Sequence, residues 1–296
     1  LLWNGDVMVV QLMLGGINID IFSERELPIS KRMQVFERKH GKADIKIRIT
    51  WEWEKARHPK SPAVGDDLIQ EYYREEDWCF CEAKGGKAPI TCTCYKEDLS
   101  QMVCAVNESP FLQPPDTFDK IIRLLPMREI FQYFHTIFLH ASQVVLDGTG
   151  IVFSASAGIG KSTQARLWGN YIGAETVCSD RTLLQKKGDE WRTYGYPMDG
   201  SEPIGNPDVH KLGCIVLLHQ SKENSVKRLK AVQAVALLIE QTIIDCWDEK
   251  AVMKEMELLL ELIEQVPVYQ LQCTPDKRAV DALMEVLIRD GVLNYV

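Results

Sequence analysis

The segment from Ile151 to Thr163 constrains this 296-residue chain more than any other. An apolar strand-like run leads into small residues, then into Gly160-Lys161-Ser162, and a helix is expected from there to about Tyr171. In such a turn, successive backbone N–H groups point inward and the positive end of a helix follows, so the turn suits phosphate oxygens. Lys161 would reach the β- and γ-phosphates of a nucleotide, and Ser162 would offer its hydroxyl to Mg²⁺.

This phosphate loop departs from the usual pattern at one position. Glycine is expected five residues before Gly160, and Ala155 stands there, which is acceptable if its φ is negative. The alternative is a chance Gly-Lys-Ser at the start of a helix. With ATP and Mg²⁺ as the expected cofactors, the residues expected to bind the nucleotide are Ala157, Gly158, Ile159, Gly160, Lys161, Ser162 and Thr163.

The chain before about residue 110 has the pattern of a small, mostly antiparallel β module. Residues 43–54 alternate apolar and polar, which predicts a half-buried antiparallel strand. Hairpins are expected where 7–14 and 17–22 flank Gly15-Gly16, and where 78–81 and 90–95 flank a second glycine turn. The proline-containing stretch 107–115 is expected to be a linker.

The remaining sequence predicts a second domain, so the expected division is 1–110 and 111–296. A helix should begin near Asp116 and be kinked or divided at Pro126. Strands and helices then alternate, which indicates an α/β arrangement in this part and an α+β chain as a whole. The expected strands are 138–146, 151–156, 175–187, 190–197, 211–220 and 266–273, and the expected later helices are 231–245, 250–264 and 276–291.

Composition and charge exclude several classes of protein. Hydrophobic residues make up 46% and charged residues 26%, which is ordinary for a globular protein, and no apolar run is long enough to span a membrane. Residues 1–14 include Asp6 and lack a basic start, so no signal peptide is expected. The net charge of −8 argues against a nucleic-acid partner. Residues 31–60 are nevertheless basic, which fits either an acidic partner or a solvated face.

Nine cysteines, an odd number, fit reduced thiols in a cytoplasmic protein better than a disulfide framework. Cys79, Cys81, Cys92 and Cys94 fall on the two strands of one expected hairpin. Four thiolates there could hold Zn²⁺, but the one-residue spacing within each pair is unusual for zinc, so packing and a disulfide are alternatives.

The run from Phe138 to Leu184 resembles the HPr serine kinase/phosphorylase family, and also ATP-dependent phosphoenolpyruvate carboxykinase, which shares that fold. His140-Ala141-Ser142 precedes the phosphate loop, and Ser179-Asp180-Arg181 follows it. The form Gly158-Ile159-Gly160-Lys161-Ser162-Thr163-Gln164, with Trp168, is most similar to HPr-kinase-like proteins of peptide-modification clusters, including lasso-peptide kinases. The resemblance implies a phosphoenolpyruvate-carboxykinase-like P-loop nucleotide-binding domain.

The resemblance also implies roles for individual residues. Lys161, Ser162 and Asp180 would serve phosphate and metal, with Asp180 also accepting the proton of the substrate hydroxyl, and His140 would lie near the metal and phosphate. Relatives carry Asp-Asp where this chain has Ser179-Asp180, so one carboxylate is missing. Arg181 would help to neutralise phosphate charge. Three of these side chains have a simpler interpretation. His140 would be a core histidine, Asp180 a strand-end carboxylate and Arg181 an ordinary ion-pair partner.

Three functions remain open from the sequence. The leading hypothesis is an ATP-dependent kinase acting on a hydroxyl, most simply a serine of a small protein or ribosomal peptide that the β module helps to recognise. The second is a kinase for a small molecule such as free serine or a sugar. The third, motivated by Ala155 and Ser179, is a nucleotide-gated binding protein without turnover. Asp199 and Glu202 could line an acceptor site or be ordinary loop carboxylates. The oligomeric state is left open.

Overall fold

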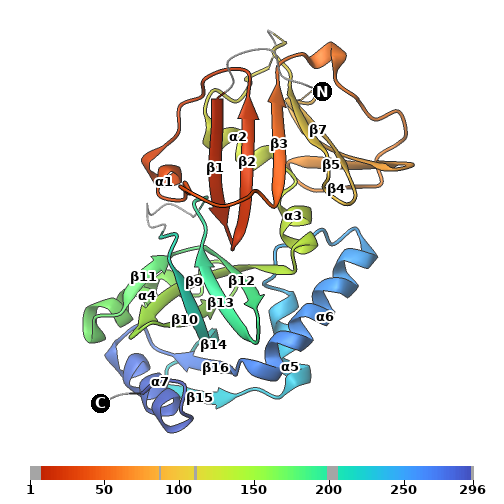
Figure 1. Ribbon diagram of the computed structural model, residues 1–296. Helices are drawn as coiled ribbons and strands as arrows, with labels where there is room; N and C mark the ends of the chain where they lie inside the picture. The colour runs from red at the N-terminus through yellow and green to blue at the C-terminus, as the bar shows by residue number, and fades with distance from the viewer. Residues whose placement is uncertain (1–7, 87, 110–111, 199–205, 295–296) are drawn as a thin grey trace. The chain divides into compact units, whose positions relative to one another are not determined.

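A computed structural model describes residues 8–86, 88–109, 112–198 and 206–294 of the chain. It is an α+β structure with two large β-sheets, and its contacts divide it into two compact units, Leu1–Tyr133 and Phe134–Val296 (Figure 1). Within the described residues, none of the helices is long and apolar enough to cross a membrane.

The first unit is built on an eight-stranded sheet in the order β1-β2-β3-β8-β7-β6-β5-β4. The two hairpins expected from the glycine turns are confirmed as β1–β2 and β6–β7, both antiparallel. Its elements are β1 (Met8–Leu14), β2 (Ile17–Ser23), α1 (Lys31–Gln34), β3 (Ile45–Thr50), the 3-10 turn η1 (Trp53–Lys55), β4 (Gly65–Asp66), β5 (Gln70–Glu75), β6 (Trp78–Ala83), β7 (Thr91–Lys96), β8 (Met102–Val106), α2 (Phe118–Leu124) and α3 (Met127–Tyr133).

The strand expected at 43–54 differs from the prediction in length and in direction of pairing. It ends at Thr50, and Trp53 already belongs to the short turn η1. β3 pairs in parallel with both β2 and β8, so it is an interior strand and the prediction of an antiparallel strand was wrong. Alternation along the sequence reports one buried face, and it carries no information about the direction of the neighbouring strands.

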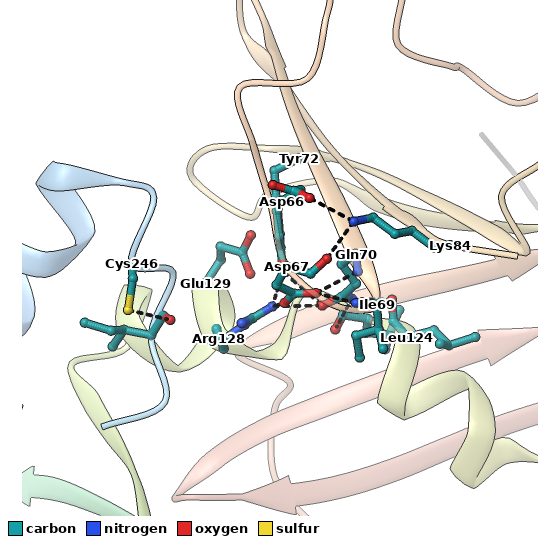
Figure 2. Close-up of polar contacts among 12 residues, drawn as sticks. Asp66, Asp67, Ile69, Gln70, Tyr72, Lys84, Leu124, Arg128, Glu129 and Cys246 are labelled. Atoms are coloured by element: carbon teal, nitrogen blue, oxygen red, sulfur yellow. Dashed lines mark hydrogen bonds and ion pairs between the residues drawn. The ribbon is translucent and has the colours of Figure 1, made fainter. Parts of the chain in front are cut away.

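Helices α2 and α3 belong to the first unit, although the expected domain boundary at 110/111 assigned them to the second. Pro126 does divide the expected helix, because a proline ring cannot continue a helix without losing a hydrogen bond. Figure 2 shows why α3 stays with this unit: Arg128 donates to Asp67, to Gln70 Oε1 at 3.1 Å and to the hydroxyl of Tyr72 at 2.5 Å. The division by contacts therefore falls between Tyr133 and Phe134.

The second unit contains another eight-stranded sheet with helices packed on it. The strand order is β10-β9-β12-β13-β14-β16-β15, and β11 pairs with β9. Its elements are β9 (Thr136–Leu146), β10 (Thr149–Ser154), α4 (Lys161–Ile172), β11 (Glu175–Cys178), β12 (Arg181–Lys187), β13 (Glu190–Gly195), β14 (Val209–Gln220), β15 (Ser225–Arg228), α5 (Ala231–Ile239), α6 (Glu249–Gln265), β16 (Val268–Cys273) and α7 (Lys277–Arg289).

An additional pairing between β10 and β14 closes part of this sheet into a ring. β10 pairs antiparallel with β9 on one edge and parallel with β14 on the other. Following the hydrogen bonds from β9 through β12, β13 and β14 therefore leads back to β10. Glycines permit the close approach: a Cβ added at Gly150 would lie 2.5 Å from a methyl carbon of Thr193, and one at Gly213 would lie 2.4 Å from a methyl carbon of Thr149.

Side chains of β10 alternate between two hydrophobic cores. Ile151 and Phe153 pack with Trp168 of α4 and with the apolar side chains of α7. Val152 points to the other face, where α5 and α6 supply buried leucines such as Leu238 and Leu259. Burial of both faces explains the continuous apolar run in the sequence. The loop that follows β10 thus begins at a strand fixed on both sides.

Two expected elements of this unit have clearly different bounds, and one strand was not expected. The strand predicted at 175–187 is two strands, because Ser179 and Asp180 separate β11 from β12. The helix predicted at 231–245 ends at Ile239. The short strand β15 was not predicted; its residues are mostly polar and exposed, so they carry no alternating pattern.

Candidate functional site

The loop between β10 and α4 has the backbone that its glycines allow. Gly158 has φ of 80° and Gly160 has φ of 121°, and both values are rarely adopted by residues with a side chain. Ala155 is not among the residues with positive φ, so alanine is accommodated where the usual pattern has glycine, as expected. The first N–H groups of α4 have no partner within the helix, which leaves them available to an anion.

Lys161 opens α4 and lies folded against the loop. Its side chain is buried, and its Nζ donates to the carbonyl oxygens of Ala155 at 2.9 Å and Ser156 at 3.4 Å. Burial lowers the pKa of Lys161 below its ordinary value, while the charge of Asp180 acts in the opposite direction. A lysine held by loop carbonyls is positioned to exchange them for the oxygens of a phosphate.

His140 and Asp180 face each other across neighbouring strands. Asp180 lies between β11 and β12, both of which pair with β9, and its carbonyl accepts from the N–H of Ala141 at 3.0 Å. His140 Nε2 and Asp180 Oδ1 are 3.0 Å apart. This hydrogen bond is the main cause of a lowered pKa for Asp180; burial opposes it, and the charges of His140, Arg181 and Lys161 add to it. Asp180 is therefore a carboxylate at neutral pH.

A cavity of about 300 Å³ brings most of the expected site residues together. Ser162, at the second position of α4, reaches the carbonyl of Ser179 with its hydroxyl at 3.4 Å. Ser179 itself is buried, and its carbonyl also accepts from Ser142 at 2.9 Å, so this position supports the backbone beside Asp180. The cavity is lined by His140, Ala157, Gly158, Gly160, Lys161, Ser162, Thr163, Ser179 and Asp180.

Two other expected residues, Ile159 and Arg181, do not line this cavity. Ile159 lines a neighbouring cavity instead. Arg181 is not among the cavity's lining residues; its Nη1 donates to the carbonyl of Met198 at 3.0 Å, and its Nε lies 3.8 Å from Asp180 Oδ2. Asp199 and Glu202 lie outside the described residues.

The neighbouring cavity, about 330 Å³, contains residues that the sequence did not single out as a site. Gln220 ends β14 and donates to the loop carbonyls of Ile159 at 3.1 Å and Gly158 at 3.4 Å. Thr274 follows β16, the parallel neighbour of β14. Both residues stand at the carboxyl ends of parallel strands, where ligands of open α/β sheets bind, and that position is the signal that identifies them.

Fold and site together define an α+β protein with a glycine turn and a buried lysine at the start of a helix, beside a histidine–aspartate pair. The model of a protein family described as SynChlorMet cassette protein ScmC matches residues 117–282, which is more than half of the chain. The chain belongs to this family.

Among solved structures, the Hpr(Ser) kinase/phosphatase from Coxiella burnetii is similar at 15% identity and a TM-score of 0.31, over 52% of this chain and 89% of that one. A comparison with curated proteins gave no match.

Proposed function

We propose that the chain is an ATP-dependent phosphotransferase that transfers the γ-phosphoryl group to a hydroxyl, most simply the serine hydroxyl of a small protein or peptide. One observation carries the proposal. A buried lysine, a serine hydroxyl and a histidine-paired carboxylate line a single cavity at the start of α4. Phosphoryl transfer requires positioning and neutralisation of charge, and these groups supply both.

Each residue has a role in this reaction. The hydroxyl oxygen of the acceptor attacks the γ-phosphorus, the bond to the β-phosphate oxygen breaks, and ADP departs. Asp180 accepts the hydroxyl proton, and its lowered pKa keeps it ionised and ready at neutral pH. Lys161 neutralises charge on the phosphates, and the N–H groups of the first turn of α4 bind their oxygens. His140 orients Asp180 through its hydrogen bond.

The residues present fit Mg²⁺. Ser162 and Asp180 offer a hydroxyl and a carboxylate to the same cavity, and oxygen ligands of this kind suit Mg²⁺, which also keeps several waters. When bound, the ion would supply positive charge to the β- and γ-phosphates. Ser179 offers no second carboxylate, so Asp180 would be the acidic ligand here.

The neighbouring cavity is suited to the rest of the nucleotide. The two cavities share Gly158, Gly160 and Thr163, so a molecule whose phosphates occupy the first can extend into the second. Gln220 and Thr274 offer polar groups there, beside the apolar surface of Ile159 and Pro275. This combination of apolar lining and a few polar groups is typical of small-molecule sites.

A surface on the first unit is our candidate for docking the acceptor. Lys46 and Arg48 of β3 line a cavity of about 460 Å³ together with Phe22, Met102 and Val103. Lys46 is exposed, whereas Arg48 donates to Glu24 at 2.7 Å and is partly neutralised. β3 is an interior strand, so a peptide cannot add to its edge, and binding would use side chains and charge.

A second function keeps support from one observation: among the described residues, the lining of this cavity includes one carboxylate, that of Asp180, where two would serve a metal and a base separately. A protein that binds nucleotide without turnover needs only the loop, Lys161 and the metal ligands. A kinase for a small molecule such as free serine or a sugar would use the same residues as the leading proposal and would differ only in the acceptor.

Lys161→Ala tests the proposal. With purified full-length protein, Mg²⁺ and ATP, we expect wild-type protein to bind the nucleotide in calorimetry and to transfer phosphate to serine-containing peptides, detected by intact mass. Lys161→Ala should lower transfer by roughly 10²-fold or more, because a charged group at the developing phosphate charge is lost. Lys227→Ala, an exposed lysine on β15, is the matched control.

The outcomes separate the candidates. Unchanged transfer in Lys161→Ala contradicts the phosphate-loop assignment. Nucleotide binding with no transfer to a peptide, a small molecule or water favours the binding protein.

A further inference from the structure

The β6–β7 hairpin carries four cysteines, but its register sends them to opposite faces. Glu82 pairs with Cys92 and Phe80 with Cys94, whereas Cys79 and Cys81 pair with Tyr95 and Thr93. Directly paired residues of antiparallel strands share a face, and neighbours along a strand alternate. A four-thiolate zinc site, considered from the sequence, is therefore ruled out by this register. One face instead combines two thiols with the carboxylate of Glu82.

A histidine from a different segment completes a mixed cluster on that face. One ligand atom each from His58, Glu82 and Cys92 lie within 4.8 Å of one another. His58 comes from the segment after η1, so the cluster joins a loop to a hairpin. Cys92 is only 1% exposed, and the other two side chains are partly buried. Alternation along the sequence draws attention to the cysteines of the hairpin. Only the fold shows that His58 lies beside Cys92.

We propose that His58, Glu82 and Cys92 bind one Zn²⁺ ion that fastens the segment after η1 to the β6–β7 hairpin. Nitrogen, oxygen and sulfur ligands are all accepted by zinc, with bonds of about 2.0 to 2.3 Å. Tetrahedral bonds of that length bring ligand atoms to within about 3.5 Å of one another, so the three side chains need to move inward only slightly. A water molecule would complete the four ligands.

The surroundings of the cluster suit metal ligands. His58 Nε2 lies 2.8 Å from the carbonyl of Trp53, so one ring nitrogen is held by the backbone and the other carries the lone pair that a metal needs. The hydroxyl of Tyr73 lies 3.3 Å from Glu82 Oε2 and 2.9 Å from Glu71 Oε2. Such outer contacts fix the orientation of ligands and are typical of metal sites.

Charge also favours a divalent ion. Zinc binding requires the Cys92 thiol to lose its proton, which passes to solvent, and His58 to be neutral. A thiolate, a carboxylate and Zn²⁺ then sum to zero charge. A neutral complex reduces the cost of burial, which is high for an unpaired ion. No change in the oxidation state of any group is involved.

The position of the cluster indicates a structural role. Apart from η1, residues 51–64 form no helix or strand, and other contacts also hold them to the hairpin side. Glu75 accepts from the N–H groups of Lys60 and Ser61, and the guanidinium of Arg57 lies 4.4 Å from the ring centre of Trp78. A metal bond would add a stronger tie where the backbone has few hydrogen bonds of its own.

The experiment uses full-length protein stripped with EDTA, then given Zn²⁺ or Co²⁺ alone and desalted. We expect one zinc per chain by elemental analysis, and a Co²⁺ derivative with a near-ultraviolet absorption band from a bound thiolate. Cys92→Ala should abolish the band and weaken binding at least about 100-fold, since even outer-sphere changes cost roughly 10- to 100-fold. Cys94→Ala, on the same face two residues away, is the matched control and should keep both signals.

Cys92→Ala removes a buried side chain and could prevent folding. His58→Ala, at a partly exposed loop position, provides the second variant, with folding checked by circular dichroism. Loss of the metal in folded His58→Ala together with retention in Cys94→Ala supports the site. Absence of stoichiometric zinc in wild-type protein, a Co²⁺ derivative without the thiolate band, or equal loss in Cys94→Ala overturns it.

Discussion

Replacing Asp180 by asparagine separates the chemical role of this residue from its structural one. The amide keeps the shape of the carboxylate and can still form a hydrogen bond with His140, whose Nε2 lies 3.0 Å from Asp180 Oδ1. The side chains of His140 and Asp180 are 29% and 32% exposed, so solvent screens their charges. We therefore expect Asp180→Asn to lower the free energy of unfolding by only about 1 kcal/mol.

Turnover should fall much further than stability. The variant loses the proton acceptor, a loss that typically costs 10²- to 10⁴-fold. A 10²-fold fall corresponds to about 2.7 kcal/mol in the activation free energy. Phosphate transfer from ATP would be measured beside chemical denaturation of the same preparations, with Asp189→Asn, an exposed carboxylate in the β12–β13 turn, as control. Turnover equal to wild type in Asp180→Asn would refute the role of Asp180.

The pH dependence gives an independent check on Asp180. Its pKa is lowered in the folded protein, chiefly by the hydrogen bond with His140. A lowered pKa stabilises the fold above the unfolded value of about 3.9, and this stabilisation is lost as the pH falls through the folded value. The difference in unfolding free energy between wild type and Asp180→Asn should thus shrink as the pH falls below about 4. A difference that stays unchanged or grows below about pH 4 would contradict this assignment.

Three further predictions concern packing and partner binding. Trp168→Ala should lower the free energy of unfolding by about 3 to 5 kcal/mol in urea denaturation, because the indole is fully buried beneath the site; a loss below about 1 kcal/mol would contradict this packing. Arg128→Ala should cost roughly 2 to 4 kcal/mol by the same assay, since it leaves Asp67 partly buried without its cation, and an unchanged midpoint would show that the network of Figure 2 adds nothing. The double variant Lys46→Glu with Arg48→Glu should raise the KM for an acidic peptide acceptor at low salt and leave the KM for ATP unchanged; equal acceptor KM values would remove this surface from the docking site.

Local patterns predicted the elements around the loop well, because each pattern depends on neighbours in the sequence. Ile151 to Phe153 is apolar on both faces, Gly158 and Gly160 permit positive φ, and a helix begins at Lys161, as expected. Pro126 divides the expected helix because its own ring cannot continue a helix, which is a local property of that residue.

Features that depend on distant residues could not be predicted in the same way. The parallel pairing of β3 is decided by β2 and β8, and nothing within 43–54 reports it. Gln220 reaches the loop only because β14 lies beside β10. His58 meets Cys92 because a loop crosses one face of a hairpin, and no spacing of ligands along the sequence records that contact.

The ring of strands in the second unit has a consequence for the order of folding and for local opening. Phe153 pairs with Val216, so the ring closes only after chain segments far apart in sequence have met, which is a slow type of contact. Once closed, β10 has no free edge from which to fray, and its amide hydrogens should exchange with solvent only when the whole unit opens. The loop from Ala155 to Gly160 can therefore change conformation around a ligand while the strand that anchors it stays formed.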